Sequence, residues 1–359
     1  MNSKEMKKQL LSKRKKENLK TAEYLSTGST LLNLAITGKP NKGFAVGRYY
    51  FLVGDSTSGK TFLSLTCLAE AAKNKLFKNH RFIFDNSEDG AMMDIKKFFG
   101  KRVYKRIQPP NILHSNRPNC STSIEEFYYN VDDAIKANRP FIYILDSMDS
   151  LSSAAEQEKF DETKKAARIG KKVAGSYGDG KAKKNSTNLR RLLGPLKNSK
   201  SILIVISQTR DNLGFGFETK TRSGGNALRF YSTVEMWSSI KGRIKKTIKG
   251  KKRQLGILCK IKIKKNRITG REREVIIPIY HSIGIDDIGS CINFLTEEKH
   301  WPEKGSVVKA SEFEFKGRKE KLIQLIEKNE WEMDLRDIVG DIWNEIEEAC
   351  RIKRKPRYE

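Results

Sequence analysis

The sequence predicts an α/β protein with a mostly parallel, twisted sheet, and two observations carry this prediction. Short apolar runs alternate with helix-like segments, a pattern typical of parallel strands that are buried on both faces. The first of these runs also leads into a glycine-containing loop and then into a helix-like segment. The expected strands are residues 49–53, 82–84, 141–145, 202–206, 232–237, 257–263 and 274–279. We expect the last two to form an antiparallel edge.

Residues 54–61 read Gly-Asp-Ser-Thr-Ser-Gly-Lys-Thr and fit the phosphate-binding pattern GxxxxGK(S/T). In such a loop the backbone N–H groups point at the phosphates, Lys60 reaches the β- and γ-phosphates, and the hydroxyl of Thr61 holds Mg²⁺. Residues 62–72 have the composition of a helix, whose positive end would face the phosphates. The sequence therefore predicts nucleoside triphosphate binding by Gly54, Asp55, Ser56, Thr57, Ser58, Gly59, Lys60 and Thr61.

Polar residues follow three of the later expected strands, where a nucleotide-hydrolysing site needs them. Asp146 comes directly after the third strand and fits the carboxylate that coordinates Mg²⁺ through water. Glu88 follows the second strand and is the candidate general base, with Asp85 and Asp89 as alternatives because spacing does not say which carboxylate reaches the γ-phosphate. Gln208 follows the fourth strand, at the sheet edge where ligands bind, and could sense the γ-phosphate.

The excess of positive charge predicts a polyanionic partner. The chain has 71 Lys and Arg against 43 Asp and Glu, a formal net charge of +28. We favour nucleic acid over a membrane surface, because the sequence has no apolar run of about 18 residues, no signal peptide and no lipidation motif. Five scattered cysteines without a CxxC pair, and only four histidines, predict free thiols in a reducing compartment and argue against structural zinc.

The chain divides into three segments. Residues 1–25 are lysine-rich and predict a short basic helix that docks on DNA or a neighbouring protomer, or else a solvated tail. Residues 26–301 hold the predicted core, and residues 302–359 repeat apolar positions at helical spacing, which predicts a small helical appendage. Within the core, residues 241–253 hold eight basic and no acidic residues and predict a hairpin-like excursion that binds duplex DNA or is simply solvated.

Two stretches have compositions suited to nucleic-acid contact. Residues 164–191 hold ten Lys or Arg and one acidic residue, interrupted by glycines, as a flexible phosphate-neutralising loop requires. Residues 211–225 carry Leu213, Phe215 and Phe217 between glycines, and exposed apolar groups on such a loop stack on bases or insert between them. The alternative is that one or more of these phenylalanines is buried in the core.

Together these motifs resemble those of the RecA family of DNA strand-exchange recombinases, including phage-encoded relatives of the UvsX type. The resemblance covers roughly residues 26–295. It runs through Ser-Thr-Gly-Ser (26–29), Gly-Arg (47–48), the phosphate-binding loop, Asp-Ser (146–147) and Ile-Ser-Gln-Thr-Arg (206–210). Its most specific parts are Ser-Gly-Gly-Asn-Ala-Leu-Arg-Phe-Tyr-Ser (223–232) and Lys-Lys-Asn-Arg (264–267).

The resemblance implies a RecA-type P-loop NTPase core that uses ATP and Mg²⁺ and forms a helical filament on single-stranded DNA. It implies a cytoplasmic, DNA-dependent ATPase that captures duplex DNA and exchanges strands in recombination and repair, assisted by single-strand-binding and loader proteins. By position, Thr61 and Asp146 match the metal ligands, and the catalytic residues match Lys60, Glu88, Gln208, Lys265 and Arg267. The last two match family lysines that reach the neighbouring protomer's γ-phosphate, and Arg267 keeps the charge on a planar fork.

The family's two DNA-binding loops match residues 160–190 and 211–226 of this chain. The candidate DNA-binding residues are Lys164, Lys165, Arg168, Lys171, Lys172, Arg210, Leu213, Phe215, Phe217, Lys220, Arg222, Gly224, Gly225 and Asn226.

The chain also departs from the family pattern. Asp85 and Glu88 are three residues apart, whereas the family usually has a two-residue step between these carboxylates. The segment 241–253 is unusually cationic, and the carboxyl terminus lacks the acidic end common among bacterial members. The basic loops and short appendage suggest a phage or a mobile element as the source. Two other classes remain as alternatives, namely a RecA-fold hexameric helicase or motor and a nucleotide-switched DNA-binding protein.

Overall fold

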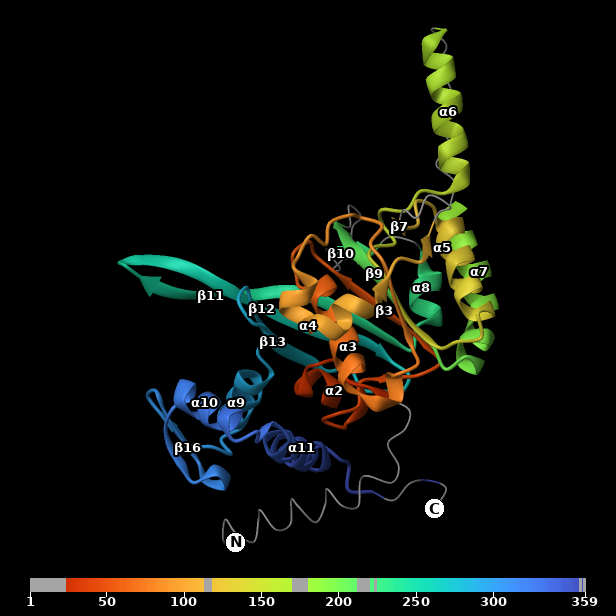
Figure 1. The fold of residues 1–359 in the computed structure, drawn as a ribbon. Coiled ribbons are helices and arrows are strands. Elements are labelled where there is room, and N and C mark those ends of the chain that lie inside the picture. The colour runs from red at the N-terminus through yellow and green to blue at the C-terminus, as the bar shows by residue number, and fades with distance from the viewer. Residues whose placement is uncertain are drawn as a thin grey trace.

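The computed structural model describes residues 24–112, 118–169, 180–211, 220–222, 225–354 and 357, so most of the expected basic helix in residues 1–25 lies outside the described residues. A ten-stranded sheet forms the centre (Figure 1), in the order β14-β13-β12-β11-β3-β9-β8-β4-β5, with β10 paired to β9. Its strands are β3 (Arg48–Gly54), β4 (Arg81–Asp85), β5 (Ile107–Gln108), β8 (Phe141–Leu145), β9 (Ile202–Asp211), β10 (Lys220–Arg222), β11 (Val234–Ile248), β12 (Lys251–Asn266), β13 (Glu274–Tyr280) and β14 (Gly284–Ile285). Neighbours from β11 to β5 are parallel, while β12, β13 and β14 are antiparallel. The expected mostly parallel sheet with an antiparallel edge is confirmed.

Helices cover both faces of this sheet. Alternate residues of a strand point to opposite faces. Accordingly Tyr50 and Leu52 of β3 lie in one core, whereas Tyr49, Phe51 and Val53 lie in the other. The first core includes residues of α2 (Thr30–Thr37), α3 (Lys60–Lys73), α4 (Ile95–Arg106) and α9 (Asp287–Glu297), and the second includes residues of α5 (Ile124–Lys136), α7 (Gly180–Asn198) and α8 (Asn226–Tyr231). Burial on both sides explains why the strands read as continuous apolar runs.

Two elements project from the core in Figure 1. The helix α6 (Ala154–Arg168) stands away from the sheet, and none of its residues is buried. The outer parts of β11 and β12 extend as a two-stranded ribbon, which confirms the hairpin expected for residues 241–253. Smaller elements are β1 (Tyr24–Leu25), β2 (Phe44–Ala45), β6 (Asn111–Ile112), β7 (Pro118–Asn119) and the 3-10 turn η1 (Lys75–Phe77). Among the described helices, none is both long and apolar enough to cross a bilayer.

The carboxyl-terminal part contains strands as well as the two expected helices. The helices are α10 (Lys319–Lys328) and α11 (Glu332–Ala349), and the small antiparallel sheet comprises β15 (Glu303–Lys304), β16 (Val307–Ala310) and β17 (Phe315–Arg318), with the turn η2 (Ser311–Phe313). The appendage is therefore not helical throughout. Its strands have two to four residues, too few to show a period-two alternation in sequence.

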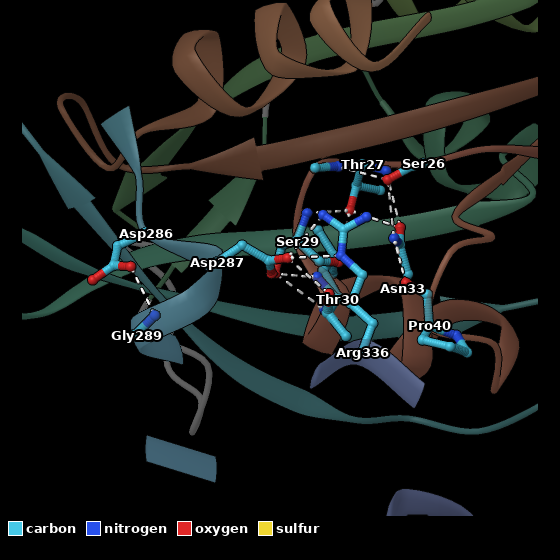
Figure 2. A network of polar contacts seen from close by, with 12 residues as sticks. Ser26, Thr27, Ser29, Thr30, Asn33, Pro40, Asp286, Asp287, Gly289 and Arg336 are labelled. Carbon is cyan, nitrogen blue, oxygen red and sulfur yellow. Dashed lines mark hydrogen bonds and ion pairs between the residues drawn. The ribbon is translucent and has the colours of Figure 1, made fainter. Parts of the chain in front are cut away.

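A polar network joins this appendage to the core (Figure 2). Asp287, in the first turn of α9, accepts hydrogen bonds from the backbone N–H of Thr30 (2.6 Å) and from its hydroxyl (2.8 Å). Arg336 of α11 pairs with the same carboxylate at 3.1 Å, and both side chains are largely buried. One carboxylate thus ties together α2, α9 and α11.

Candidate nucleotide site and DNA interface

The phosphate-binding loop connects β3 to α3, as its pattern predicts. Gly59 has a φ of 91°, and a Cβ there would lie 2.6 Å from Cδ1 of Ile279, so both the backbone conformation and the space require glycine. The loop is also held to β11, because the hydroxyls of Ser58 and Ser238 lie 2.5 Å apart. The loop conformation is therefore fixed by the neighbouring strands.

Lys60 places a buried ammonium group in this loop. The residue is 8% exposed, and its Nζ donates to the carbonyl oxygens of Gly54 (2.9 Å) and Asp55 (2.7 Å). Burial lowers the pKa of Lys60, while the negative charges of Asp146 and Glu88 act to raise it. A bound phosphate would supply the nearby negative charge that favours the protonated ammonium.

The candidate Mg²⁺ ligands are in direct contact. Thr61 lies in the first turn of α3, and Asp146 directly follows β8. The hydroxyl of Thr61 donates to Oδ2 of Asp146 at 2.5 Å. Burial raises the pKa of Asp146, and the Thr61 hydrogen bond and the charge of Lys60 lower it. A hydroxyl and a carboxylate oxygen side by side are hard ligands of the kind Mg²⁺ takes when phosphates and water complete its shell. The residues therefore fit a nucleotide-bound Mg²⁺.

A cavity of about 400 Å³ brings most of the predicted nucleotide residues together. Its lining is Ser56, Thr57, Ser58, Gly59, Lys60, Thr61, Phe62, Asn86, Glu88, Gly90, Ala91, Met93, Asp146 and Gln208. A larger cavity of about 590 Å³ lies between β13, α9 and α11, but none of the predicted site residues lines it. We place the candidate nucleotide site at the smaller cavity, because it holds the phosphate-binding loop and the charged groups.

Glu88 and Gln208 meet at the edge of this cavity. The side-chain Nε2 of Gln208 donates to Oε1 of Glu88 at 2.7 Å, and the hydroxyl of Ser147 donates to the same oxygen. Glu88 is exposed, so its carboxylate is accessible from the cavity. This contact connects the loop after β4 with β9.

Asp85 occupies a different position from Glu88. Asp85 is fully buried, and its carboxylate accepts hydrogen bonds from the Ser121 backbone (2.8 Å), the Ser121 hydroxyl (2.6 Å) and the Tyr143 hydroxyl (2.6 Å). Neither Asp85 nor Asp89 lines the nucleotide cavity. Of the three carboxylates left open by sequence spacing, only Glu88 faces that cavity.

The sequence reasoning missed Asp149, which anchors the strand that carries Gln208. Its Oδ2 accepts hydrogen bonds from the backbone N–H of Gln208 (2.6 Å) and the hydroxyl of Ser207 (2.7 Å). Nearby, the hydroxyl of Thr209 donates to Asp55 of the phosphate-binding loop. The only available signal was an acidic residue three positions after Asp146, and its partner on β9 could not be read from that spacing.

Lys265 and Arg267 lie together, away from the cavity. Nζ of Lys265 donates to the carbonyl oxygens of Arg229 (2.6 Å) and Phe230 (2.8 Å), and Arg267 donates to the carbonyl of Phe230 (2.7 Å). These carbonyls belong to the last turn of α8, so that helix orients both cations. Neither cation lines the nucleotide cavity of its own chain.

Glu235 is a second residue that sequence reasoning did not single out. It is fully buried on β11, directly across from Lys265 on β12. Its carboxylate pairs with Arg229 of α8 at 3.2 Å and accepts a hydrogen bond from Nε1 of Trp237 at 3.0 Å. Glu235 therefore places a buried negative charge near Arg229 and Lys265.

The candidate DNA-binding residues are only partly described. Lys164, Lys165 and Arg168 are exposed on α6. Gly225 has a φ of 78° at the start of α8, and Asn226 is the exposed first residue of that helix. Arg210, Lys220 and Arg222 lie on the paired strands β9 and β10, and for these three residues only the backbone is described. Outside the described residues lie Lys171, Lys172, Leu213, Phe215, Phe217 and Gly224.

The strand, loop and helix around Lys60, with a strand-end carboxylate beside Thr61, define a P-loop nucleoside triphosphate-binding protein. Comparison with known proteins narrows this class. Residues 131–286 match the family model described as the RecA N-terminal domain. Protein RecA of Rhodopirellula baltica is 30% identical over 287 residues, which cover 80% of this chain and 68% of that protein. The chain belongs to the RecA family.

Two other relatives show the same level of similarity. Protein RecA of Bacteroides thetaiotaomicron is 27% identical over 289 residues, covering 78% of this chain and 76% of the relative. Protein RecA of Trichodesmium erythraeum is 26% identical over 316 residues, covering 86% of this chain and 76% of the relative. The residues that match the family model include Asp146 and Gln208 and the strands β8, β9, β11, β12 and β13, and they follow the phosphate-binding loop in sequence.

Proposed function

We propose that this chain is an ATP-dependent homologous recombinase that forms a filament on single-stranded DNA, captures duplex DNA and exchanges strands. The observation that carries the proposal is the hydrogen bond between Gln208 and Glu88. It joins the candidate nucleotide cavity to β9, and β9 leads directly into the candidate second DNA loop at residues 211–226. Gln208 and β9 therefore form a short connection between the position of the γ-phosphate and a DNA-binding segment.

The residues of the cavity have distinct roles in this proposal. Lys60 binds the β- and γ-phosphates, and Thr61 and Asp146 hold Mg²⁺, which neutralises phosphate charge when bound. Glu88 accepts a proton from the attacking water as general base. Gln208 responds to the γ-phosphate and holds the start of the second DNA loop, so hydrolysis weakens DNA binding.

Lys265 and Arg267 act on the nucleotide of a neighbouring protomer in this proposal, so that ATP is held between copies of the chain. A DNA-dependent ATPase of this kind would work in the cytoplasm, in recombination and repair, with single-strand-binding and loader proteins. The family match supports this function, because residues 146–147, 206–210, 223–232 and 264–267, which carry part of the resemblance, lie within the matched residues 131–286.

The substitution Lys60→Ala tests the proposal. We expect it to abolish ATP-dependent strand exchange, because the phosphates lose their main cationic partner. The control is Lys73→Ala, at an exposed position near the other end of the same helix, which should leave exchange unchanged. Full exchange by the Lys60 variant would contradict the whole scheme.

Electron microscopy distinguishes the recombinase from the two other classes. With single-stranded DNA and a non-hydrolysable ATP analogue, a recombinase forms helical filaments. Discrete closed rings would instead support a hexameric motor. An ATPase rate that does not respond to single-stranded DNA would support a nucleotide-switched binding protein.

A further inference from the structure

The outer part of the β11–β12 hairpin, residues 241–253, is a two-stranded ribbon that we call the basic ribbon. Pairing of β11 with β3 ends at Ser238, and pairing of β12 with β13 ends at Gly256. Beyond these points the two strands pair only with each other, from Ile244 opposite Gly256 to Ile248 opposite Lys251. Five residues of a strand span about 17 Å, so the ribbon reaches well beyond the sheet (Figure 1).

The basic ribbon carries an unbalanced positive charge. Its eight basic residues are Lys241, Arg243, Lys245, Lys246, Lys249, Lys251, Lys252 and Arg253, and it has no acidic residue. Every residue from 245 to 254 is exposed. In the described part of the chain, no ion pair is recorded between these residues and a carboxylate. Lys246 lies directly opposite Arg253, a like-charge pair that destabilises a hairpin.

An isolated two-stranded hairpin is marginally stable in water, and self-repulsion reduces its stability further. A polyanion would remove that repulsion and bind at the same time. Cross-strand pairs alternate between the two faces, so Lys246, Lys251 and Arg253 share one face while Lys245 and Lys252 lie on the other. The ribbon can therefore meet phosphates on both of its sides.

Duplex DNA fits these features better than single-stranded DNA does. The major groove of B-form DNA admits a two-stranded β-ribbon and has a phosphate backbone along each side. Proteins that hold single strands usually add aromatic side chains on which bases stack. The basic ribbon has no aromatic residue. Its lysine-rich composition suits phosphate contacts, which carry no base sequence information.

We propose that the basic ribbon is a duplex-DNA-binding arm that docks in the major groove, independent of sequence and of bound nucleotide. The inference rests on the proposed function, in which the chain captures duplex DNA. It assigns that capture to a surface separate from the two candidate DNA loops. The ribbon contains none of the residues of the nucleotide cavity. Duplex binding through it therefore requires neither Lys60 nor ATP.

The test measures binding of the full chain, without nucleotide, to a labelled duplex of mixed sequence over a series of salt concentrations. The variant combines Lys246→Gln, Lys251→Gln, Lys252→Gln and Arg253→Gln, all at exposed positions. Each phosphate contact contributes about 0.9 to the slope of log affinity against log salt, so the slope should fall by about 3 to 4. The matched control changes four exposed lysines elsewhere to Gln, at Lys75, Lys78, Lys101 and Lys105. It should leave the slope within about one unit of the original.

Further probes separate the possible outcomes. Affinity for oligo(dT) should fall much less than affinity for the duplex, and duplex RNA should show little dependence on the ribbon, because the A-form major groove is too narrow. An unchanged duplex slope, equal losses for duplex and single strand, or equal dependence on RNA would each overturn the proposal. Ribbon-dependent binding to anionic vesicles without duplex binding would also overturn it.

A second pair of measurements keeps the result interpretable. The single changes Lys246→Gln and Arg253→Gln should each lower the slope by about 0.9, even if the combined variant folds poorly. The same loss should occur in a Lys60→Ala background. Strand exchange that persists in that background would contradict the proposed function, whereas a salt slope that the ribbon changes leave unaltered would contradict only the ribbon proposal.

Discussion

The pH dependence of ATP turnover tests whether Lys265 acts as a cation on a neighbouring nucleotide. Burial lowers the pKa of Lys265 to about 8, and the positive charges of Arg267 and Arg229 lower it as well, while Glu235 acts to raise it. A lysine with a pKa of about 8 is about nine-tenths charged at pH 7 and about one-tenth charged at pH 9. If only the charged form acts, kcat/KM for DNA-dependent ATP turnover should fall about tenfold between these values, because kcat/KM follows the pKa of the nucleotide-free protein.

The substitution Lys265→Arg should remove this fall, because arginine stays charged throughout the range. The control is Lys264→Arg, since Lys264 instead lies over the ring of Trp237, 4.1 Å from its centroid. That variant should keep the alkaline fall. If Lys265→Arg shows the same loss above pH 8 as the unchanged protein, Lys265 is not the titrating group and the reasoning is refuted.

Deprotonation of Lys265 would not lower turnover by unfolding the protein. The native pKa is below the ordinary lysine value, so between about pH 8 and 10 the unfolded state binds more protons than the native state. Stability from this group therefore rises with pH in the same window in which activity is lost. A melting temperature that does not fall between pH 8 and 10, while turnover falls, would match this prediction.

Glu235 provides an independent check on the cause. Glu235→Gln removes the carboxylate that favours protonated Lys265 and keeps a side chain of the same size, so the alkaline fall should move to lower pH. In a Lys265→Arg background the same change should leave the pH profile flat. A shift of equal size in both backgrounds would mean that Glu235 acts through another group.

Two further predictions concern the appendage and the candidate base. Arg336→Met removes the charged partner of Asp287 and should lower the free energy of unfolding by about 3 kcal/mol in urea denaturation, with the exposed Arg318→Met as control. A loss below about 1 kcal/mol would contradict the anchoring role of that pair. Glu88→Gln should lower turnover about 100-fold and retain nucleotide binding, whereas Asp85→Asn should mainly reduce stability. The opposite pattern would reassign the base to Asp85.

The parts of the site that depend on contiguous residues could be predicted from the sequence. Residues 54–61 fold as expected because strand, loop and helix follow one another without a long-range choice. Asp146 and Gln208 could also be placed, since each follows an apolar run long enough to identify as a buried strand. Parallel strands then bring their carboxyl ends to one edge of the sheet, which is why both residues line the same cavity.

Residues whose partners are distant in sequence could not be assigned in this way. Asp149 contacts Gln208 only because the loop after β8 lies beside β9 in the folded chain. Glu235 meets Lys265 through the register of β11 and β12, which has irregularities that sequence patterns do not reveal. Choosing Glu88 over Asp85 likewise required seeing that Ser121 and Tyr143 already occupy the Asp85 carboxylate.

The rigidity of the sheet also bears on where Lys265 and Arg267 can act. In the strand register, Lys265 of β12 lies opposite Glu235 of β11, and Glu235 lies opposite Phe51 of β3. The phosphate-binding loop begins at Gly54, three residues further along β3. That offset is about 10 Å along the strands and about 10 Å across two strand spacings. The ammonium group of Lys265 is also held by the carbonyls of α8. A lysine anchored there is poorly placed for its own nucleotide, so we infer that the two cations complete the site of a second copy and that turnover depends on association.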